Sequence, residues 1–349
     1  MAYQVCKRCI LDSNMLNISF DAEGVCNFCN EYKKNEVSPT KEYYISKGKE
    51  FSGLLAKSSK SHKYDCICLY SGGKDSTYML SELVRKYKLR VLSFTLDHGF
   101  MARQAFVNIG KVHSKLNCDS IIFRPSNELK TAVLRAGIFE YRRLESSQEL
   151  AYMIGCVCWP CFVLIAMSAI KFAVEKKIPN LIIGTTPGQI RQKKYNLRAK
   201  YSGLPDVYNA MVVPMMKILK VSGNKKLAGE LDLSFLDKLK VAKVKLLPFY
   251  EYNEYNEEKV IRTAKAEFGW EKPPETDSCS SNCLLNSLGI KLHRMKFNMS
   301  PYAIPFSRDI REGLIDREEA LHAVNTAPDA GVINDIAQSL GIDLEKIGT

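Results

Sequence analysis

The sequence contains no apolar run that approaches the roughly 20 residues needed to cross a bilayer. Its first residues, MAYQVCKRC, lack the apolar segment of a secretory signal. These two absences argue against a membrane-inserted or secreted protein, so we expect a cytoplasmic location. The 349 residues, 46% of them hydrophobic and 25% charged, are enough for one large α/β domain with appendages, or for two domains.

Histidine is scarce, and the five histidines show no spacing typical of metal ligands, whereas cysteine occurs twelve times. A disulfide framework is not expected in the reducing cytoplasm, so the cysteine spacing points to metal instead. Two C-x2-C pairs stand near the N-terminus, at Cys6, Cys9, Cys26 and Cys29. This spacing is typical of a structural four-thiolate zinc site. So short a segment cannot form a large hydrophobic core, and a bound metal ion would stabilise its fold instead. We therefore predict a zinc-binding module at residues 1–35.

The positive charge is concentrated in one segment. The net charge of the chain is +12, and residues 189–245 contain thirteen Lys or Arg against four Asp or Glu, a net charge of +9. Such a segment suits a polyanion, either nucleic acid or a phosphorylated substrate. A solvated face on exposed helices is the alternative interpretation.

From residue 64 onward, short apolar runs alternate with helical patterns. The runs DCICLY, RVLSFTL, SIIF and LIIG are typical of buried parallel strands, and amphipathic segments separate them. This alternation predicts a doubly wound parallel sheet in a domain spanning residues 60–250. The remainder, residues 251–349, is expected to be a mostly helical substrate or partner region.

Three polar segments follow predicted strands. They are the loop that begins at Ser71, then Asp97, and then Gly184 with Thr185. Since ligands of such sheets bind beyond the carboxyl ends of the strands, we expect all three segments at one binding site.

The loop reads SGGKDST and does not fit the Walker pattern, because Asp75 follows Lys74 and no glycine stands five residues before Gly73. Gly72 and Gly73 allow a tight turn whose N–H groups point inward, and the next helix directs its positive end to the same place. The hydroxyl groups of the loop add further donors. The pattern therefore predicts a phosphate-binding loop.

The segment SGGKDS resembles the signature of the PP-loop ATP pyrophosphatases, a family with the adenine nucleotide α-hydrolase-like fold. The resemblance implies that ATP is cleaved between the α and β phosphates and that an acceptor oxygen is adenylated. By the same resemblance, pyrophosphate is bound by Ser71, Gly72, Gly73, Asp75, Ser76 and Thr77. It further implies that Lys74 contacts the phosphates, that Asp97, Gly184 and Thr185 contact the nucleotide, and that Asp75 helps to hold Mg²⁺.

The N-terminal segment CKRCILDSNMLNISFDAEGVCNFC is similar to that of the N-acetyl sugar amidotransferases of surface-polysaccharide pathways. YNEYNEEKVIRTAKAEFGW and IREGLIDREEAL also resemble that group. The resemblance implies that the amide oxygen of an N-acetylated nucleotide sugar is adenylated and then replaced by nitrogen. No cysteine of the chain stands in a glutaminase context, so ammonia from a separate glutaminase subunit is implied.

One feature departs from that group. GCVCWPCF resembles the Fe–S tRNA thiolases of the same superfamily, which implies a [4Fe–4S] cluster on Cys158, Cys161 and Cys283, with Cys156 or Cys279 as substitutes. This alternative predicts a sulfurtransferase that acts on a tRNA base or a small molecule. A second zinc ion on Cys158, Cys161, Cys279 and Cys283, or unligated thiols, are the other interpretations of the group. A nucleotide-binding regulator without turnover is a third functional class, against which the intact loop argues.

Overall fold

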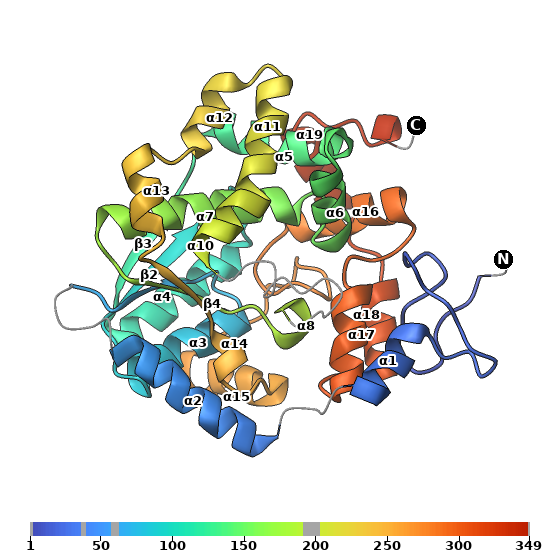
Figure 1. Cartoon of the computed structure of the whole chain (residues 1–349), viewed down its shortest axis with the longest axis horizontal. Coiled ribbons are helices and arrows are strands. Elements are labelled where there is room, and N and C mark those ends of the chain that lie inside the picture. Colours follow the sequence, from blue (N-terminus) through green and yellow to red (C-terminus); the bar gives the residue numbers. More distant parts are fainter. Residues whose placement is uncertain (1–2, 36–39, 57–62, 191–202, 348–349) are drawn as a thin grey trace.

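The computed structural model describes residues 3–35, 40–56, 63–190 and 203–347 (Figure 1). Its centre is a five-stranded parallel sheet, formed by β1 Cys66–Leu69, β2 Val91–Leu96, β3 Asp119–Phe123, β4 Asn180–Ile183 and β5 Lys245–Pro248. The strand order is β3-β2-β1-β4-β5. The predicted doubly wound parallel sheet is therefore confirmed.

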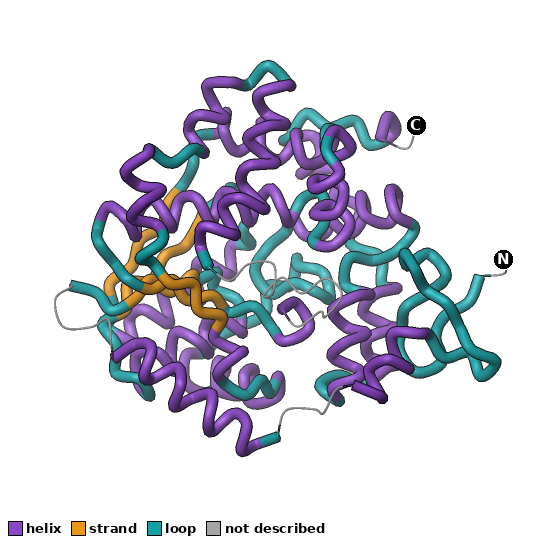
Figure 2. Tube along the Cα trace, viewed as in Figure 1, coloured by secondary structure: helices purple, strands orange, loops and turns teal. Residues whose placement is uncertain are grey.

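Alternate residues of the central strand β1 belong to different hydrophobic cores. Cys66 and Cys68 pack with the apolar residues of α2 Lys41–Ala56, α3 Lys74–Arg85 and α4 Arg103–Leu116. Ile67, which lies between them, packs with α5 Asn127–Phe139 and α7 Cys158–Glu175. Because successive strand residues point to opposite faces, an almost continuous apolar run is what a sheet covered on both sides requires. Figure 2 shows the strands enclosed by helices in this way.

Helix α7 is, among the described residues, the one helix long and apolar enough to cross a membrane by length and composition alone. It packs against β1, β2 and β4, and its buried residues include Trp159, Val163 and Ile170. Contact with both the sheet and α5 explains why the helix is apolar around most of its circumference.

Two predictions from local composition were wrong. The polar segment NEYKKNEVSPTKEYY, residues 30–44, predicts a linker, but α1 Asn27–Asn35 and α2 occupy most of it, and Phe51 and Leu55 of α2 are buried in the core. The composition of residues 186–246 predicts a less regular region, but its described part contains helices and the strand β5. The pattern did not reveal β5 because only Leu246 and Leu247 separate a lysine from a proline.

Short helices make up the rest of the described chain, and the expected helical C-terminal region is confirmed. They are η1 Tyr141–Arg143, α6 Glu145–Met153, α8 Pro187–Ile190, α10 Leu204–Val207, η2 Tyr208–Val212, α11 Val213–Val221, α12 Lys225–Leu231, α13 Phe235–Val241, α14 Phe249–Tyr252, α15 Glu257–Phe268, α16 Leu285–Phe297, α17 Ala303–Glu312, α18 Arg317–Asn325, α19 Ala330–Ser339 and η3 Glu345–Ile347. The N-terminal segment packs against the C-terminal helices, where Met15 meets Met299 and Ile304 in one apolar cluster.

Candidate functional site

The strand order reverses between β1 and β4, which lie side by side at the centre of the sheet. The chain leaves β1 into the Ser71–Thr77 loop and α3, and it leaves β4 into Gly184, Thr185 and α8. At such a switch point, the connections leave in opposite directions and open a crevice beyond the carboxyl ends of the strands. Gly184 lies against α3 at this edge, since a Cβ atom on it would lie 3.8 Å from Ser76 Cα, and Asp97 follows the neighbouring strand β2.

Backbone geometry fixes the shape of the loop. Gly72 has a φ of +75°, and a Cβ atom there would lie 2.7 Å from the carbonyl oxygen of Ala105. Both the backbone conformation and the lack of space therefore exclude a side chain at this position. Gly73 is the N-cap of α3 and offers no side chain to bond the first N–H groups of the helix. Those N–H groups have no partner within the helix, so they can bind an anion at its positive end.

Hydroxyl groups close the loop on itself. The Oγ atoms of Ser71 and Ser76 lie 3.1 Å apart, and Ser76 Oγ donates to the carbonyl of Gly73 at 3.1 Å. The side chain of Thr77 lies 3.2 Å from the hydroxyl of Tyr70. Ser76 and Thr77 are buried, whereas Ser71 is half-buried at the crevice.

Two aromatic side chains from the C-terminal half hold the loop in place. Trp270 Nε1 donates to the carbonyl of Gly72 at 3.0 Å, and the Tyr250 hydroxyl donates to the carbonyl of Asp75 at 2.8 Å. Both side chains are buried. From the sequence alone, Trp270 is expected to be a core or hinge residue and the segment 250–255 a surface turn, so their contacts with the loop were not predicted.

Lys74 and Asp75 form a charged cluster with two residues of the segment after β5. Lys74 Nζ lies 3.0 Å from Asp75 Oδ2 and 3.0 Å from Glu257 Oε1, and the Tyr255 hydroxyl donates to Asp75 Oδ1 at 3.0 Å. Burial alone would lower the pKa of Lys74, but Asp75 and Glu257 outweigh it and raise that pKa. Burial, and then Asp75 and Glu257, raise the pKa of Tyr255, so its hydroxyl stays protonated. The ammonium group of Lys74 is thus held in place beside the loop, in the first turn of α3.

Asp97 is buried at the end of β2, where Arg124 and the N–H of Gly99 both donate to its carboxylate. Its predicted contact with the nucleotide must therefore compete with Arg124. The neighbouring His98 is also buried, and burial lowers its pKa to about 4, a shift that Lys130 reinforces and Asp97 opposes. His98 is therefore neutral at pH 7.

The second cysteine group lies beside the loop. Cys158 and Cys161 begin α7, and Cys283 Sγ lies 3.6 Å from His98 Nε2. The segment that carries Cys283 runs next to the loop, since a Cβ atom at Gly73 would lie 2.8 Å from Ser281 Oγ.

The surroundings of this group favour the protonated thiols when no metal is bound. Burial raises the pKa of both Cys158 and Cys283 to about 12, and burial, followed by Cys283, raises the pKa of Cys161. Cys156 is fully buried in the core cluster beneath α7. The thiol of Cys279 contacts the carbonyl of Ala323 at 3.8 Å.

The described structure brings one of the two cysteine groups together closely enough for a zinc ion. A tetrahedral zinc ion with Zn–S bonds of about 2.3 Å needs its sulfur atoms about 3.8 Å apart. Within the described ranges, only the N-terminal cysteines form a group of three or more potential ligand atoms all within 4.8 Å of one another.

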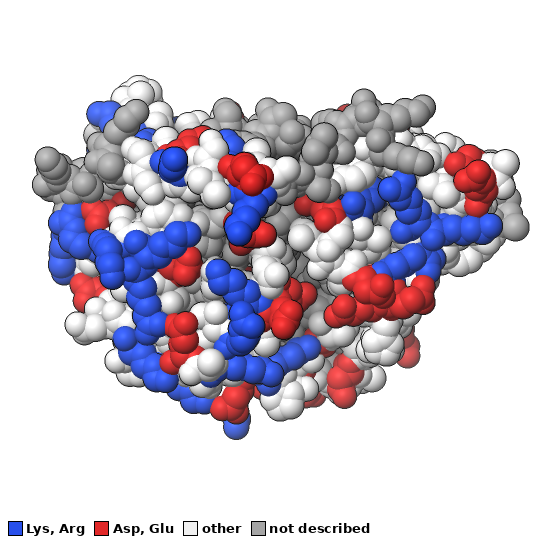
Figure 3. Space-filling model, turned by 90° about the horizontal axis from the view of Figure 1, so that it is seen from below, with Lys and Arg blue, Asp and Glu red and all other residues white. Residues whose placement is uncertain are grey.

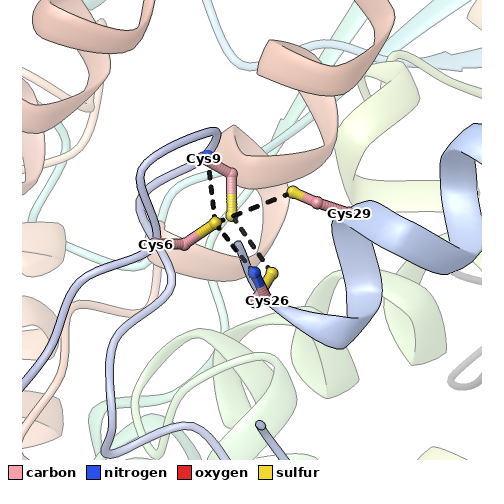
Figure 4. A group of neighbouring side chains, drawn as sticks. All are labelled: Cys6, Cys9, Cys26 and Cys29. Carbon is pink, nitrogen blue, oxygen red and sulfur yellow. Dashed lines mark hydrogen bonds between the residues drawn. The ribbon is translucent and has the colours of Figure 1, made fainter. Parts of the chain in front are cut away.

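The N-terminal cysteines form a closed tetrad (Figure 4). Cys6 and Cys29 lie 3.9 Å apart by their Sγ atoms, Cys9 and Cys26 lie 3.7 Å apart, and all four are fully buried. These separations match the edge of a tetrahedral metal–thiolate site. The tetrad can therefore hold a metal ion.

Arginines of the C-terminal helices contact this tetrad directly. Arg317 donates to the carbonyls of Cys6 and Cys9, each at 3.1 Å, and Arg311 Nη1 lies 3.9 Å from Cys29 Sγ. The metal module is thus joined to α17 and α18 by hydrogen bonds as well as by apolar packing.

The basic segment is only partly described, because five of its thirteen cationic residues lie within residues 191–202, outside the described ranges. Among the others, Lys238 pairs with Asp232 at 2.9 Å and Lys240 with Asp237 at 3.5 Å. Figure 3 shows the opposite side of the molecule, that of α2 and α15, where basic and acidic side chains are interspersed.

No protein-family model matches the chain. A curated relative, "Uncharacterized protein MJ1599" of Methanocaldococcus jannaschii, is 29% identical over 140 residues, which are 40% of this chain and 49% of the relative. The match thus spans about half the length of that relative.

Two solved structures are similar at low sequence identity. The U34-tRNA thiolase NcsA from Methanococcus maripaludis, solved with its [4Fe-4S] cluster, has 16% identity and a TM-score of 0.35, over 94% of this chain and 98% of that one. The NMN synthetase from Francisella tularensis has 12% identity and a TM-score of 0.33, over 86% of this chain and 97% of that one. At these TM-scores neither similarity bears on the reaction.

Replacing Gly72 with alanine tests the shape of the loop. We expect Gly72→Ala to destabilise the fold by about 1–3 kcal/mol, because it combines a positive φ with a clash against Ala105. Gly223→Ala is the matched control, since Gly223 has a φ of +84° and open space around it. Chemical unfolding measures both variants. Equal losses for the two would mean that close packing does not constrain the loop.

Replacing Cys26 with serine tests the tetrad. We expect the purified protein to contain about one thiolate-bound metal ion per chain, and we expect Cys26→Ser to lose it and to unfold at lower temperature. Cys118→Ser, a half-buried cysteine outside both groups, should retain the metal. Elemental analysis and thermal unfolding measure these effects. Full metal content in Cys26→Ser would contradict the assignment.

Proposed function

We propose that the chain is an ATP-dependent amidotransferase that forms AMP and pyrophosphate. It adenylates the amide oxygen of an N-acetylated nucleotide sugar and replaces that oxygen with nitrogen from ammonia. A glutaminase partner supplies the ammonia, and the reaction serves surface-polysaccharide biosynthesis in the cytoplasm.

The observation that carries this proposal is the place of the Ser71–Thr77 loop at the switch point of the sheet. The loop joins the carboxyl end of β1 to a helix whose first N–H groups have no side-chain cap. This arrangement suits the pyrophosphate half of ATP, because several N–H donors and a helix dipole converge there at no cost in rearrangement. The sequence resemblance of SGGKDS supports the same assignment.

The position of Lys74 supports the proposal. Asp75 and Glu257 hold its cation beside the loop, each at 3.0 Å, where it would also contact the phosphates of ATP. Asp75 is a half-buried carboxylate at the first turn of α3, a position where it and the phosphate oxygens would hold Mg²⁺. Bound Mg²⁺ would neutralise part of the negative charge of the triphosphate.

The acceptor is inferred from the sequence similarity of the N-terminal and C-terminal segments to the sugar amidotransferases. The segments that resemble the sugar amidotransferases include Tyr255 and Glu257 of the charged cluster and Arg311 and Arg317, which contact the metal tetrad. The basic segment of residues 189–245 would then attract the diphosphate of the nucleotide sugar.

Asp75→Asn tests the loop as the site of ATP cleavage. We expect the variant to release pyrophosphate at least about 100-fold more slowly, because it loses the charge that would hold Mg²⁺ and position Lys74. The assay uses ATP, Mg²⁺, ammonium chloride and UDP-N-acetylglucosamine as the acceptor probe. Asp335→Asn, an exposed residue of α19, is the control. Unchanged release by Asp75→Asn, with release intact in the wild type, would rule out this loop as the site.

A second candidate function, sulfur transfer, is favoured by the position of Cys158, Cys161 and Cys283. Cys158 and Cys161 begin α7, Cys283 lies on the segment beside the loop, and three thiolates could hold three corners of a [4Fe–4S] cluster. Such a cluster supplies an iron without a protein ligand, which can carry sulfide. The adenylated oxygen would then belong to a tRNA base or a small molecule.

Metal analysis of anaerobically purified protein separates the two candidates. Sulfur transfer predicts about four irons per chain and broad absorbance near about 400 nm, both lost in Cys161→Ser, while the tetrad keeps its own metal. Amidotransfer predicts a colourless protein without iron. Iron that survives in Cys161→Ser and disappears in Cys26→Ser would place the cluster at the tetrad instead.

A further inference from the structure

Helix α13 exposes apolar side chains that a globular protein would normally bury. Phe235, Leu236 and Leu239 are 76%, 62% and 58% exposed, and together they are called the α13 face below. The helix itself is well defined, because the side chain of Ser234 caps it by accepting a hydrogen bond from the N–H of Asp237 at 3.1 Å. Exposed apolar side chains gathered on one short element mark an interaction surface.

Lysines flank the α13 face on both sides. At about 100° per residue, the three apolar side chains lie within an arc of about 100° around the helix. Lys238 lies about 60° before this arc and Lys240 about 40° beyond it. Val241 lies opposite the arc and is buried, and the helix packs against α7. The helix therefore carries two apolar faces, of which one joins the core and the other stands in solvent between two cations.

More lysines surround this helix. Residues 217–243, from the end of α11 through α13, contain seven lysines against three carboxylates. Two of the carboxylates, Asp232 and Asp237, pair with Lys238 and Lys240. The remaining lysines are exposed, and none of them forms an ion pair with a residue of the described ranges; they are Lys217, Lys220, Lys225, Lys226 and Lys243. Such a surface attracts a polyanion.

The lysines and the α13 face belong to one region of the surface. Asp232, the residue after α12, contacts Lys238 of α13 at 2.9 Å, and α12 packs against α11. Val221 at the end of α11 is 64% exposed, which adds another apolar side chain to this region. Figure 1 shows α12 and α13 at the end of the molecule that lies away from the N-terminal module.

Charge and exposure together favour an anionic lipid surface as the occupant. A second copy of the chain would bring the same lysine-rich region against itself, which the like charges oppose. Nucleic acid would satisfy the lysines but leave Leu236 and Leu239 in water. Side chains that protrude this far need an apolar phase that moulds around them, and the boundary between lipid headgroups and acyl chains provides one.

We propose that α13 and the lysines around it dock the protein on a membrane surface that contains anionic lipids. The α13 face enters the boundary between headgroups and acyl chains, and the lysines contact lipid phosphates. The chain lies on the bilayer in this arrangement and does not span it, since α7 packs inside the fold. The inference goes beyond the proposed function and holds for either candidate reaction.

Vesicle binding by the full-length protein tests the proposal. The probes are vesicles of phosphatidylcholine alone and of phosphatidylcholine with about 30% phosphatidylglycerol. At about 0.1 M salt we expect the protein to bind the anionic vesicles at least about 10-fold more tightly than the neutral ones. Most of this binding should disappear at about 0.5 M salt, because salt screens the contacts between lysine and lipid phosphate. Flotation with the vesicles measures the bound fraction.

Paired variants separate the apolar part of the surface from the charged part. Phe235→Gln combined with Leu239→Gln should weaken binding to anionic vesicles at least about 10-fold, because the apolar insertion is lost. Lys225→Gln combined with Lys226→Gln should weaken it about 5-fold and make it less sensitive to salt. Val107→Gln, which changes a 48% exposed residue of α4, is the control and should bind like the wild type. All these side chains are exposed, so thermal unfolding should stay unchanged.

Phe235→Trp locates the contact directly. The two native tryptophans, Trp159 and Trp270, are buried, so a change in emission on addition of vesicles comes from α13. We expect the emission to move to shorter wavelength with anionic vesicles and to be quenched by lipids with brominated acyl chains.

Several outcomes would overturn the inference. Wild type that stays free of anionic vesicles at low salt, or that binds neutral vesicles equally well, would exclude an anionic lipid surface as the occupant. Full binding by the Phe235→Gln, Leu239→Gln variant, or unchanged emission from Phe235→Trp, would place the contact on another surface. Self-association of the wild type that the same double variant abolishes would make a second copy the occupant. None of these outcomes changes pyrophosphate release, so the proposed function is tested separately.

Discussion

The reversal of strand order between β1 and β4 is the constraint on which the rest of the structure depends. It brings the Ser71–Thr77 loop and the Gly184 turn together at the carboxyl edge of the sheet. The helix dipole of α3, the cation of Lys74 and the buried Asp97 all face this edge because parallel strands end there together. Every other contact at the site, including those from the C-terminal half, serves to fix or to cover this edge.

The sequence predicts those features that depend on neighbouring residues. The apolar runs of β1 to β4 are readable because each is buried on both faces, and the glycines of the loop are readable because only glycine fits there. The tetrad is readable because its ligands come in two local pairs. The strand β5 was not readable, since two leucines beside a lysine and a proline carry too little pattern.

The residues that complete the site come from far along the chain, and this explains why they were missed. Tyr255 contacts Asp75 across 180 positions, and Trp270 contacts Gly72 across 198. No local pattern marks such contacts, because a tyrosine or tryptophan that fixes a backbone carbonyl looks like any other aromatic residue in a polar segment.

Helix α17 carries two residues, Asp309 and Arg311, that contact different parts of the molecule. Arg311 touches a sulfur of the tetrad, and Asp309 rests on α8 at the sheet edge. A shift of α17 at one of these contacts would also disturb the other, because both residues lie within a single turn of one helix. A change in the metal content of the tetrad would therefore reach α8 at the carboxyl edge of the sheet through this helix.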